Sequence, residues 1–157
     1  MKSVSRFLSV VFVLVLLAGC QQSEQKKSDS SADMVKEEIS ISEARARTGP
    51  EGGMSAVYLE LSNATALDDT LKSVDSEVAE LTEVHESFTK ENGAMGMRKI
   101  PFLELNSQGK VSLKPGGYHI MLIRLKRDLA KGDTVNVTLN LSENGSIDVA
   151  APVVVTP

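Results

Sequence analysis

Cysteine is almost absent from this 157-residue chain, because Cys20 is the only one. A blue-copper electron-transfer site needs a thiolate beside two histidines, and zinc fingers and iron–sulfur clusters need several thiolates. A c-type haem needs a C-x-x-C-H attachment sequence, which the chain lacks. Cys20 directly follows an apolar N-terminal run, so we expect no thiolate of the folded part to reach a metal. These classes of metal protein are therefore excluded.

Aromatic residues are also scarce: the chain has no tryptophan, and Phe, Trp and Tyr together make up 4% of it. A noncovalent haem with His and Met axial ligands would need an apolar pocket, and this composition gives it little support. No nucleophile is paired with a base, and neither histidine has an evident acidic partner in sequence. We therefore expect a protein that is not an enzyme. The net charge of −4, without a basic stripe, argues against nucleic acid as a partner.

Residues 1–19 are expected to be a lipoprotein signal peptide. Lys2 and Arg6 precede an apolar run, 7–17, that is too short to span a bilayer as a stable helix. The sequence Leu-Ala-Gly-Cys that ends at Cys20 resembles a bacterial lipobox, which implies cleavage before the cysteine and lipidation of its sulfur. An ordinary secretory signal or a short membrane anchor is the alternative. Each interpretation places the domain outside the cytoplasm, in a bacterial cell envelope.

The rest of the chain divides into a tether and one domain. Residues 20–34 comprise the lipidated cysteine and a polar segment with too little apolar surface to offset its chain entropy, so we expect a flexible tether. Residues 35–157 are long enough for a single domain with a core. Removal of residues 1–19 takes away two positive charges and no acids, which changes the net charge from −4 to −6. We expect a monomer, held at the inner or the outer membrane by its lipid.

Short alternating segments between Gly, Asn, Asp and Pro turns predict an all-β domain, a sandwich or a barrel. Segment 54–61 is rich in strand-forming residues, and 118–125 is apolar throughout, as expected of a central strand. Segment 78–84 is expected to be a strand, but it alternates less cleanly and could be a helix by local propensity. Pro101 within 98–105 predicts an edge strand or a bend. Without a disulfide, we expect Val, Leu and Ile packing alone to hold the core. Further strands are expected at 35–46, 70–74, 110–113, 134–141 and 147–155.

Both histidines lie in one stretch with methionines at set distances. The pattern is His85, eleven residues, Met97, twenty-one residues, His119, one residue and Met121. A thioether sulfur is soft and uncharged and binds Cu(I), whereas Zn(II), Mg(II) and Ca(II) prefer thiolate, imidazole or oxygen ligands. Two imidazoles and two thioethers without a thiolate therefore predict a Cu(I) site.

Strand geometry explains how part of this site could form. His119 and Met121 are two residues apart on a predicted strand, so both side chains point to the same face. Ile120 and Leu122 then point to the other face, into the core. The glycines at 116–117 allow a tight turn and the close approach of another segment.

The other two candidate ligands come from a neighbouring segment. His85 lies at the end of a strand-like run, and Met97 follows a polar loop at 90–93. Met95 could take the place of Met97 as a ligand, could assist metal transfer, or could simply pack. Two methionines have no spacing argument and are expected to be structural: Met34 and Met54.

The chain resembles the periplasmic copper chaperones of the PCuAC type over about residues 44–155. The strongest block, 114–122, reads KPGGYHIML and is followed by Leu-Lys at 125–126 and KGDTV at 131–135. Two further blocks support the resemblance: Ala-Val-Tyr-Leu at 56–59, and Val-His-Glu at 84–86 with Met-Gly-Met-Arg at 95–98.

The resemblance implies a cupredoxin-like β-sandwich that binds Cu(I) through His85, Met97, His119 and Met121. It also implies delivery of copper to an acceptor in the envelope, notably the CuA centre of cytochrome c oxidase. The chain departs from the family in its first gap, which is usually ten residues and is eleven here, and in Ser87, where many members carry methionine. Two alternatives stay open from the residues: a lipid-anchored interaction module with an incidental His/Met pattern, and a copper redox protein.

Overall fold

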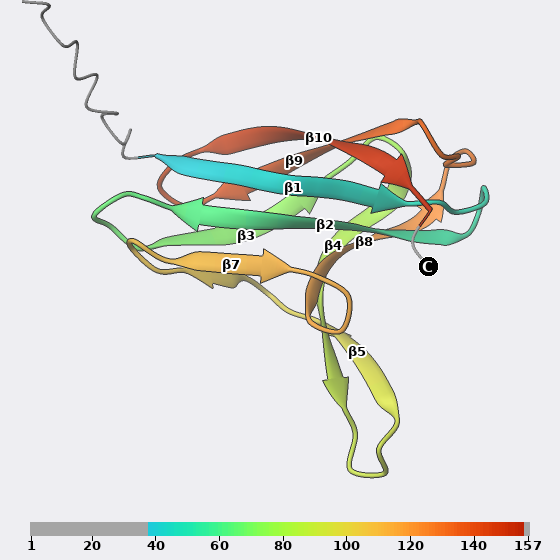
Figure 1. Cartoon of the computed structure of the whole chain (residues 1–157), viewed down its shortest axis with the longest axis horizontal. Helices are drawn as coiled ribbons and strands as arrows, with labels where there is room; N and C mark the ends of the chain where they lie inside the picture. The colour runs from blue at the N-terminus through green and yellow to red at the C-terminus, as the bar shows by residue number, and fades with distance from the viewer. Residues whose placement is uncertain (1–37, 156–157) are drawn as a thin grey trace, which may run out of the picture. The chain divides into compact units, whose positions relative to one another are not determined.

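The computed structural model describes residues 38–155, and those residues form strands and loops without a helix. The signal peptide, Cys20 and the whole tether at 20–34 thus lie outside the described residues. No segment of the described part forms a helix that could cross a bilayer. The ten strands, shown in Figure 1, are β1 (Ile39–Arg47), β2 (Met54–Asn63), β3 (Asp69–Asp75), β4 (Ala79–Thr89), β5 (Met95–Lys99), β6 (Leu103–Leu105), β7 (Lys110–Leu113), β8 (Tyr118–Leu125), β9 (Thr134–Leu141) and β10 (Ser146–Val154).

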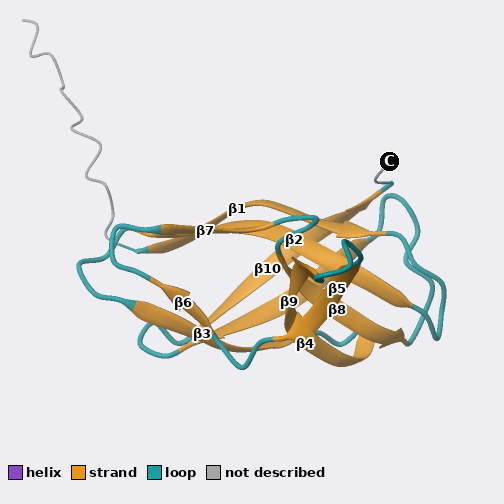
Figure 2. Cartoon of the chain, turned by 90° about the horizontal axis from the view of Figure 1, so that it is seen from below, coloured by secondary structure: helices purple, strands orange, loops and turns teal. Residues whose placement is uncertain are grey.

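The strands form one continuous hydrogen-bonded order, β5-β4-β8-β7-β2-β1-β10-β9-β3-β6, with β8 also paired to β2. A parallel pairing between β1 and β10 joins the half that holds β4, β8 and β2 to the half that holds β9 and β3. The two halves fold over one another, so that β1 and β7 lie above β3 and β6 in Figure 2. The expected all-β, cupredoxin-like sandwich is confirmed.

Leucine, isoleucine and valine fill the space between the two layers. The largest completely buried side chains are all of these three types, as the alternation of the strands predicted. β8 illustrates the rule: Ile120 and Leu122 are 0% exposed, while Met121 between them faces away from the core. The sheet face that carries His119 and Met121 is thus fixed by the apolar residues on its back.

The middle of the chain settles one alternative and corrects one expectation. The strand expected at 78–84 is confirmed as β4, which runs from Ala79 to Thr89, and the helix alternative is wrong, because β8 pairs with this strand in antiparallel register. The predicted strand at 98–105 is two strands, β5 and β6, which lie at opposite ends of the strand order. Pro101 lies in the bend between them, where its missing N–H costs no ladder hydrogen bond.

Apolar packing does not hold the sandwich alone, because two buried polar side chains bind loops to it. Asn63 is 1% exposed and donates from Nδ2 to the carbonyl oxygens of Leu67 (2.9 Å) and Leu105 (3.0 Å). Its Oδ1 accepts the backbone N–H of Thr65 at 2.9 Å. No buried side-chain nitrogen or oxygen within residues 38–155 lacks a hydrogen-bond partner.

Asp69 is the second of these residues and is 4% exposed. Its Oδ1 accepts the backbone N–H groups of Thr70 (2.6 Å), Ser142 (3.0 Å) and Glu143 (3.0 Å). Its Oδ2 accepts the backbone and side-chain N–H groups of Asn144, at 3.2 and 2.7 Å. Burial alone would raise the pKa of this carboxyl, but the hydrogen bonds outweigh burial and lower the pKa below its ordinary value.

We expect Asp69→Asn to lower the free energy of unfolding at pH 7 by about 2–3 kcal/mol, because an amide NH₂ would face N–H donors in a buried site. The lowered pKa means that the unfolded chain binds the proton more tightly, so the carboxylate stabilises the fold above pH about 4. That stabilisation is lost as the pH falls through the native pKa. The difference between wild type and variant, measured by urea denaturation, should therefore shrink between pH 5 and 3.

The control for this prediction is Asp148→Asn. Asp148 is exposed and accepts one side-chain hydrogen bond, from Thr138 at 2.7 Å. Equal losses of stability in the two variants, or a difference from wild type that grows in acid, would contradict the assigned role of Asp69.

Candidate metal centre

The register of β4 against β8 places the two histidines directly opposite one another. His85 pairs with His119, although 34 positions separate them in the chain, and their ring centroids are 6.1 Å apart. Opposed residues of an antiparallel pair point to the same face, so both imidazoles lie on the face away from the core. The sequence had placed His85 at the end of a strand-like run, but the residue lies within β4.

His119 is held in one orientation by its surroundings. It is 4% exposed, its Nδ1 lies 3.0 Å from the carbonyl oxygen of Gly117, and its ring centroid is 6.5 Å from that of Tyr58. A carbonyl oxygen only accepts, so Nδ1 carries the hydrogen and the lone pair of the neutral ring is on Nε2. A histidine that ligates a metal commonly donates its other N–H in this way.

The turn before β8 supports this arrangement as expected. Gly116 has φ of 79°, a conformation that favours glycine. The carbonyl of Gly117, beside it, also accepts the backbone N–H of Ser87 at 3.0 Å. The turn thus brings β4 close to the start of β8, and one carbonyl oxygen binds both β4 and the ring of His119.

His85 has an acidic partner, contrary to the expectation from sequence. Its Nε2 lies 2.9 Å from Oε2 of Glu83, and Lys99 donates from Nζ to Oε1 of the same carboxylate at 2.8 Å. Because a carboxylate only accepts, Nε2 carries the hydrogen and the lone pair of the neutral ring is on Nδ1. The hydrogen bond from Lys99, followed by that from His85, lowers the pKa of Glu83, although burial opposes them. The Glu-x-His spacing on one strand could have revealed this pair.

A pocket of about 360 Å³ lies beside the histidines. Met97, His119 and Met121, three of the four predicted ligands, are among its lining residues. His85 is not, but its ring lies next to that of His119. Within residues 38–155, no three His, Cys, Asp or Glu side chains gather as a candidate metal cluster.

The methionine of β5 that faces this pocket is Met97 and not Met95. Met97 pairs with Ser87, which also lines the pocket. Met95 pairs with Thr89, whose Oγ1 lies 3.6 Å from the Met95 sulfur, and it does not line the pocket. Both methionines are exposed, at 61% and 60%, on the β4–β5 hairpin that projects from the sandwich in Figure 1.

Met54 also lies at this pocket. It was expected to be structural, yet it is 63% exposed and lines the same pocket as Met97 and Met121. Its spacing from the His/Met pattern gave no signal, because β2 reaches the site through its pairing with β8 and not through proximity in sequence.

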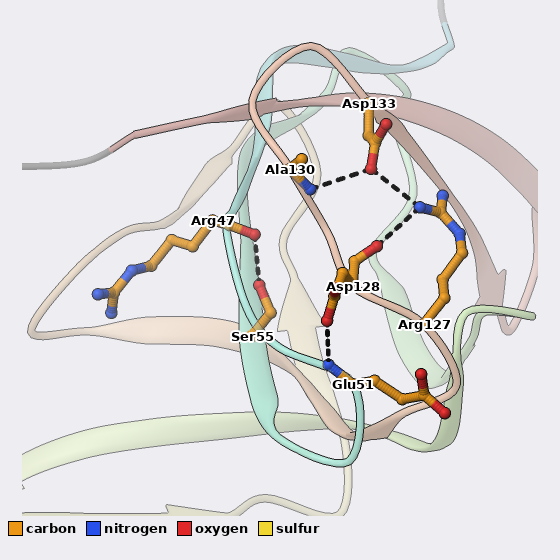
Figure 3. Close-up of polar contacts among 7 residues, drawn as sticks. All are labelled: Arg47, Glu51, Ser55, Arg127, Asp128, Ala130 and Asp133. Atoms are coloured by element: carbon orange, nitrogen blue, oxygen red, sulfur yellow. Dashed lines mark hydrogen bonds and ion pairs between the residues drawn. The ribbon is translucent and has the colours of Figure 1, made fainter.

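Hydrogen bonds fix the loops next to Met54, as Figure 3 shows. Ser55 donates from Oγ to the carbonyl oxygen of Arg47 at 2.7 Å, which joins the start of β2 to the end of β1. The backbone N–H of Glu51 donates to Oδ1 of Asp128 at 2.7 Å. Arg47 and Ser55 line the pocket, so this network anchors one wall of it.

Comparisons with known proteins agree with this fold. The model of the family "Putative lipoprotein LpqE-like" matches residues 39–153. A protein of Leifsonia xyli subsp. xyli, "Putative lipoprotein Lxx21020", is 29% identical over 156 residues, which cover 94% of this chain and 88% of that protein.

Solved PCuAC domains have a similar structure. The copper-bound PCuAC domain from PmoF2 has a TM-score of 0.63 at 21% identity and covers 76% of this chain and 94% of that one. The apo PCuAC domain from PmoF1 has a TM-score of 0.65 at 19% identity, with 76% and 95% covered. The Cu(I) form of DR1885 from Deinococcus radiodurans has a TM-score of 0.55 at 29% identity, with 72% and 77% covered. These matches confirm the resemblance to the PCuAC type, and the family model, which spans most of the chain, shows that this protein belongs to the LpqE-like family.

Proposed function

We propose that this protein is an envelope copper chaperone that binds one Cu(I) ion through His85, Met97, His119 and Met121. The observation that carries the proposal is the convergence of three of these side chains on one pocket, with the fourth imidazole beside it. The four residues come from three strands, β4, β5 and β8.

The chemistry of the four groups favours a monovalent soft ion. Thioethers and neutral imidazoles leave the charge of the site near that of the ion, and soft thioether ligands select Cu(I). In the neutral tautomers that the hydrogen bonds impose, Nδ1 of His85 and Nε2 of His119 are the atoms with free lone pairs. The structural relative from Deinococcus radiodurans was solved with Cu(I), which supports the same cargo here.

The arrangement suits delivery to a second protein. His119 is buried, whereas Met97, which lines the same pocket, is 61% exposed. An acceptor could therefore displace the exposed thioether first and the buried imidazole last. We propose that the acceptor is a copper protein of the envelope, with the CuA centre of cytochrome c oxidase as the foremost candidate, and that the chaperone performs no catalysis.

The first prediction concerns the strand that carries two ligands. The double variant His119→Ala/Met121→Leu should lower Cu(I) affinity by more than about a hundredfold, because loss of groups that merely support metal ligands already costs 10–100-fold. Competition with a Cu(I) chelator measures the affinity, and circular dichroism checks the fold. The exposed control, Met95→Leu, should bind as wild type does. Unchanged affinity in the double variant would refute the chaperone function.

The second prediction concerns Glu83. In Glu83→Gln, the ammonium of Lys99 should retain the amide oxygen and turn the NH₂ group toward His85, which would then carry its hydrogen on Nδ1. Imidazole ¹⁵N shifts should report this change of tautomer, and Cu(I) affinity should fall roughly tenfold. The control is Glu86→Gln, whose carboxylate pairs with Arg98 instead. Identical ¹⁵N shifts in wild type and Glu83→Gln would show that Glu83 does not set the tautomer.

The third prediction concerns the proposed lipid anchor. The matched family and the relative from Leifsonia are both described as lipoproteins, which supports lipidation of Cys20. Cys20→Ser should abolish incorporation of labelled palmitate and move the protein out of the membrane fraction. Copper binding by the soluble variant should be unchanged. Continued labelling of the serine variant would place the anchor elsewhere.

A further inference from the structure

Met54 is too exposed to be a core residue. It begins β2, leaves 63% of its surface open and lines the pocket that holds Met97, His119 and Met121. An exposed methionine contributes little to packing, because the apolar burial that stabilises a fold is missing. Its thioether is nevertheless the same soft donor that the proposed site uses twice.

The pairing of β2 with β8 fixes where Met54 points. Met54 lies opposite Ile123, and Ala56 lies opposite Met121. Met54 and Met121 are therefore diagonal neighbours on one face, a relation in which backbones are about 7–8 Å apart and long side chains can meet. Ala56, directly opposite Met121, is 5% exposed and small, so the β2 residue paired with Met121 leaves room beside it.

The backbone at Met54 is held in place while its side chain stays exposed. Gly52 donates its N–H to the carbonyl oxygen of Leu125 at 2.7 Å, and Leu125 donates to the carbonyl oxygen of Gly53 at 3.0 Å. These bonds tie the turn before β2 to the end of β8. The backbone of Met54 is thus fixed beside the pocket, whereas its side chain, which has three rotatable bonds, stays flexible.

We propose that Met54 is a fifth donor of the copper centre and that it alternates with His85 as a ligand of the ion. This inference rests on the proposed function. Five donors exceed the roughly four that a closed-shell ion holds in tetrahedral coordination, as it does in zinc sites. His85 is the donor that Met54 replaces, because it does not line the pocket, whereas Met54 does. Exchange between the two lets the ion stay bound while an acceptor displaces one ligand.

A double-mutant cycle on the full chain in detergent tests this exchange. Met54→Leu and His85→Ala should each lower Cu(I) affinity by about tenfold and no more, because the other donor substitutes. The variant that combines them should lose roughly tenfold more than the product of the single losses, the coupling expected of residues that share one partner. Met95→Leu, of matched exposure, should combine with His85→Ala without coupling.

A second measurement reports contact with the ion directly. With methionine methyl groups labelled with ¹³C, Cu(I) should shift the signals of Met54, Met97 and Met121 and leave that of Met95 unchanged. The inference would be overturned if Cu(I) did not shift the Met54 methyl signal, or if the combined variant lost only the product of the two single losses of Cu(I) affinity. The chaperone function would stand in either case. Failure of the wild type to take up Cu(I) would instead overturn the proposed function.

Discussion

The pairing of β4 with β8 is the constraint on which the rest of the site depends. Seven pairs join the two strands, and one of them sets His85 opposite His119. Because side chains alternate along a strand, a slip by one residue would turn one histidine into the core and bring an apolar residue to the pocket. The completely buried Ile120 and Leu122 make that slip costly, so the packing of the core is also what aligns the site.

Buried polar side chains also help to hold the sandwich together. Within the described residues there is no cysteine, so a disulfide cannot fix the layers there. Asn63 instead binds the loop between β2 and β3 and the backbone of β6, and Asp69 accepts hydrogen bonds from the turn between β9 and β10. A buried polar group with all its partners specifies one arrangement, because any other arrangement would leave it unpaired. The core supplies most of the burial, and these two residues select which loops lie where.

The sequence predicted what depends on local alternation and missed what depends on pairing across the sheet. The common face of His119 and Met121 follows from strand period alone, and the structure has it. The helix alternative for 78–84 was wrong because β8 supplies hydrogen bonds that outweigh local propensity. The same alternation places Glu83 and His85 on one face of their strand, so this pair could also have been predicted from the sequence.

Met54 could not have been found from spacing, because only the β2–β8 register brings it near Met121. An isolated methionine in a β-protein usually fills the core, but Met54 is the first residue of β2 and lines the pocket. Partners that adjoin through the sheet become visible only once strand order is known, and here β8 touches both β2 and β4.

The proposed centre has one fixed donor and several movable donors. The imidazole of His119 is buried and its Nδ1 donates to the carbonyl oxygen of Gly117, whereas His85 does not line the pocket and is the ligand that we propose exchanges with Met54. Met54 and Met97 are more than half exposed, the first at the start of β2 and the second on a projecting hairpin. Fixed donors define where an ion rests, because little side-chain entropy is lost when they bind it. Movable donors define how it leaves, because each can be replaced without disturbing the fold. A binding site built only from buried groups would hold copper but release it slowly. A site built only from exposed thioethers would bind copper with little preference over other exposed methionines of the surface.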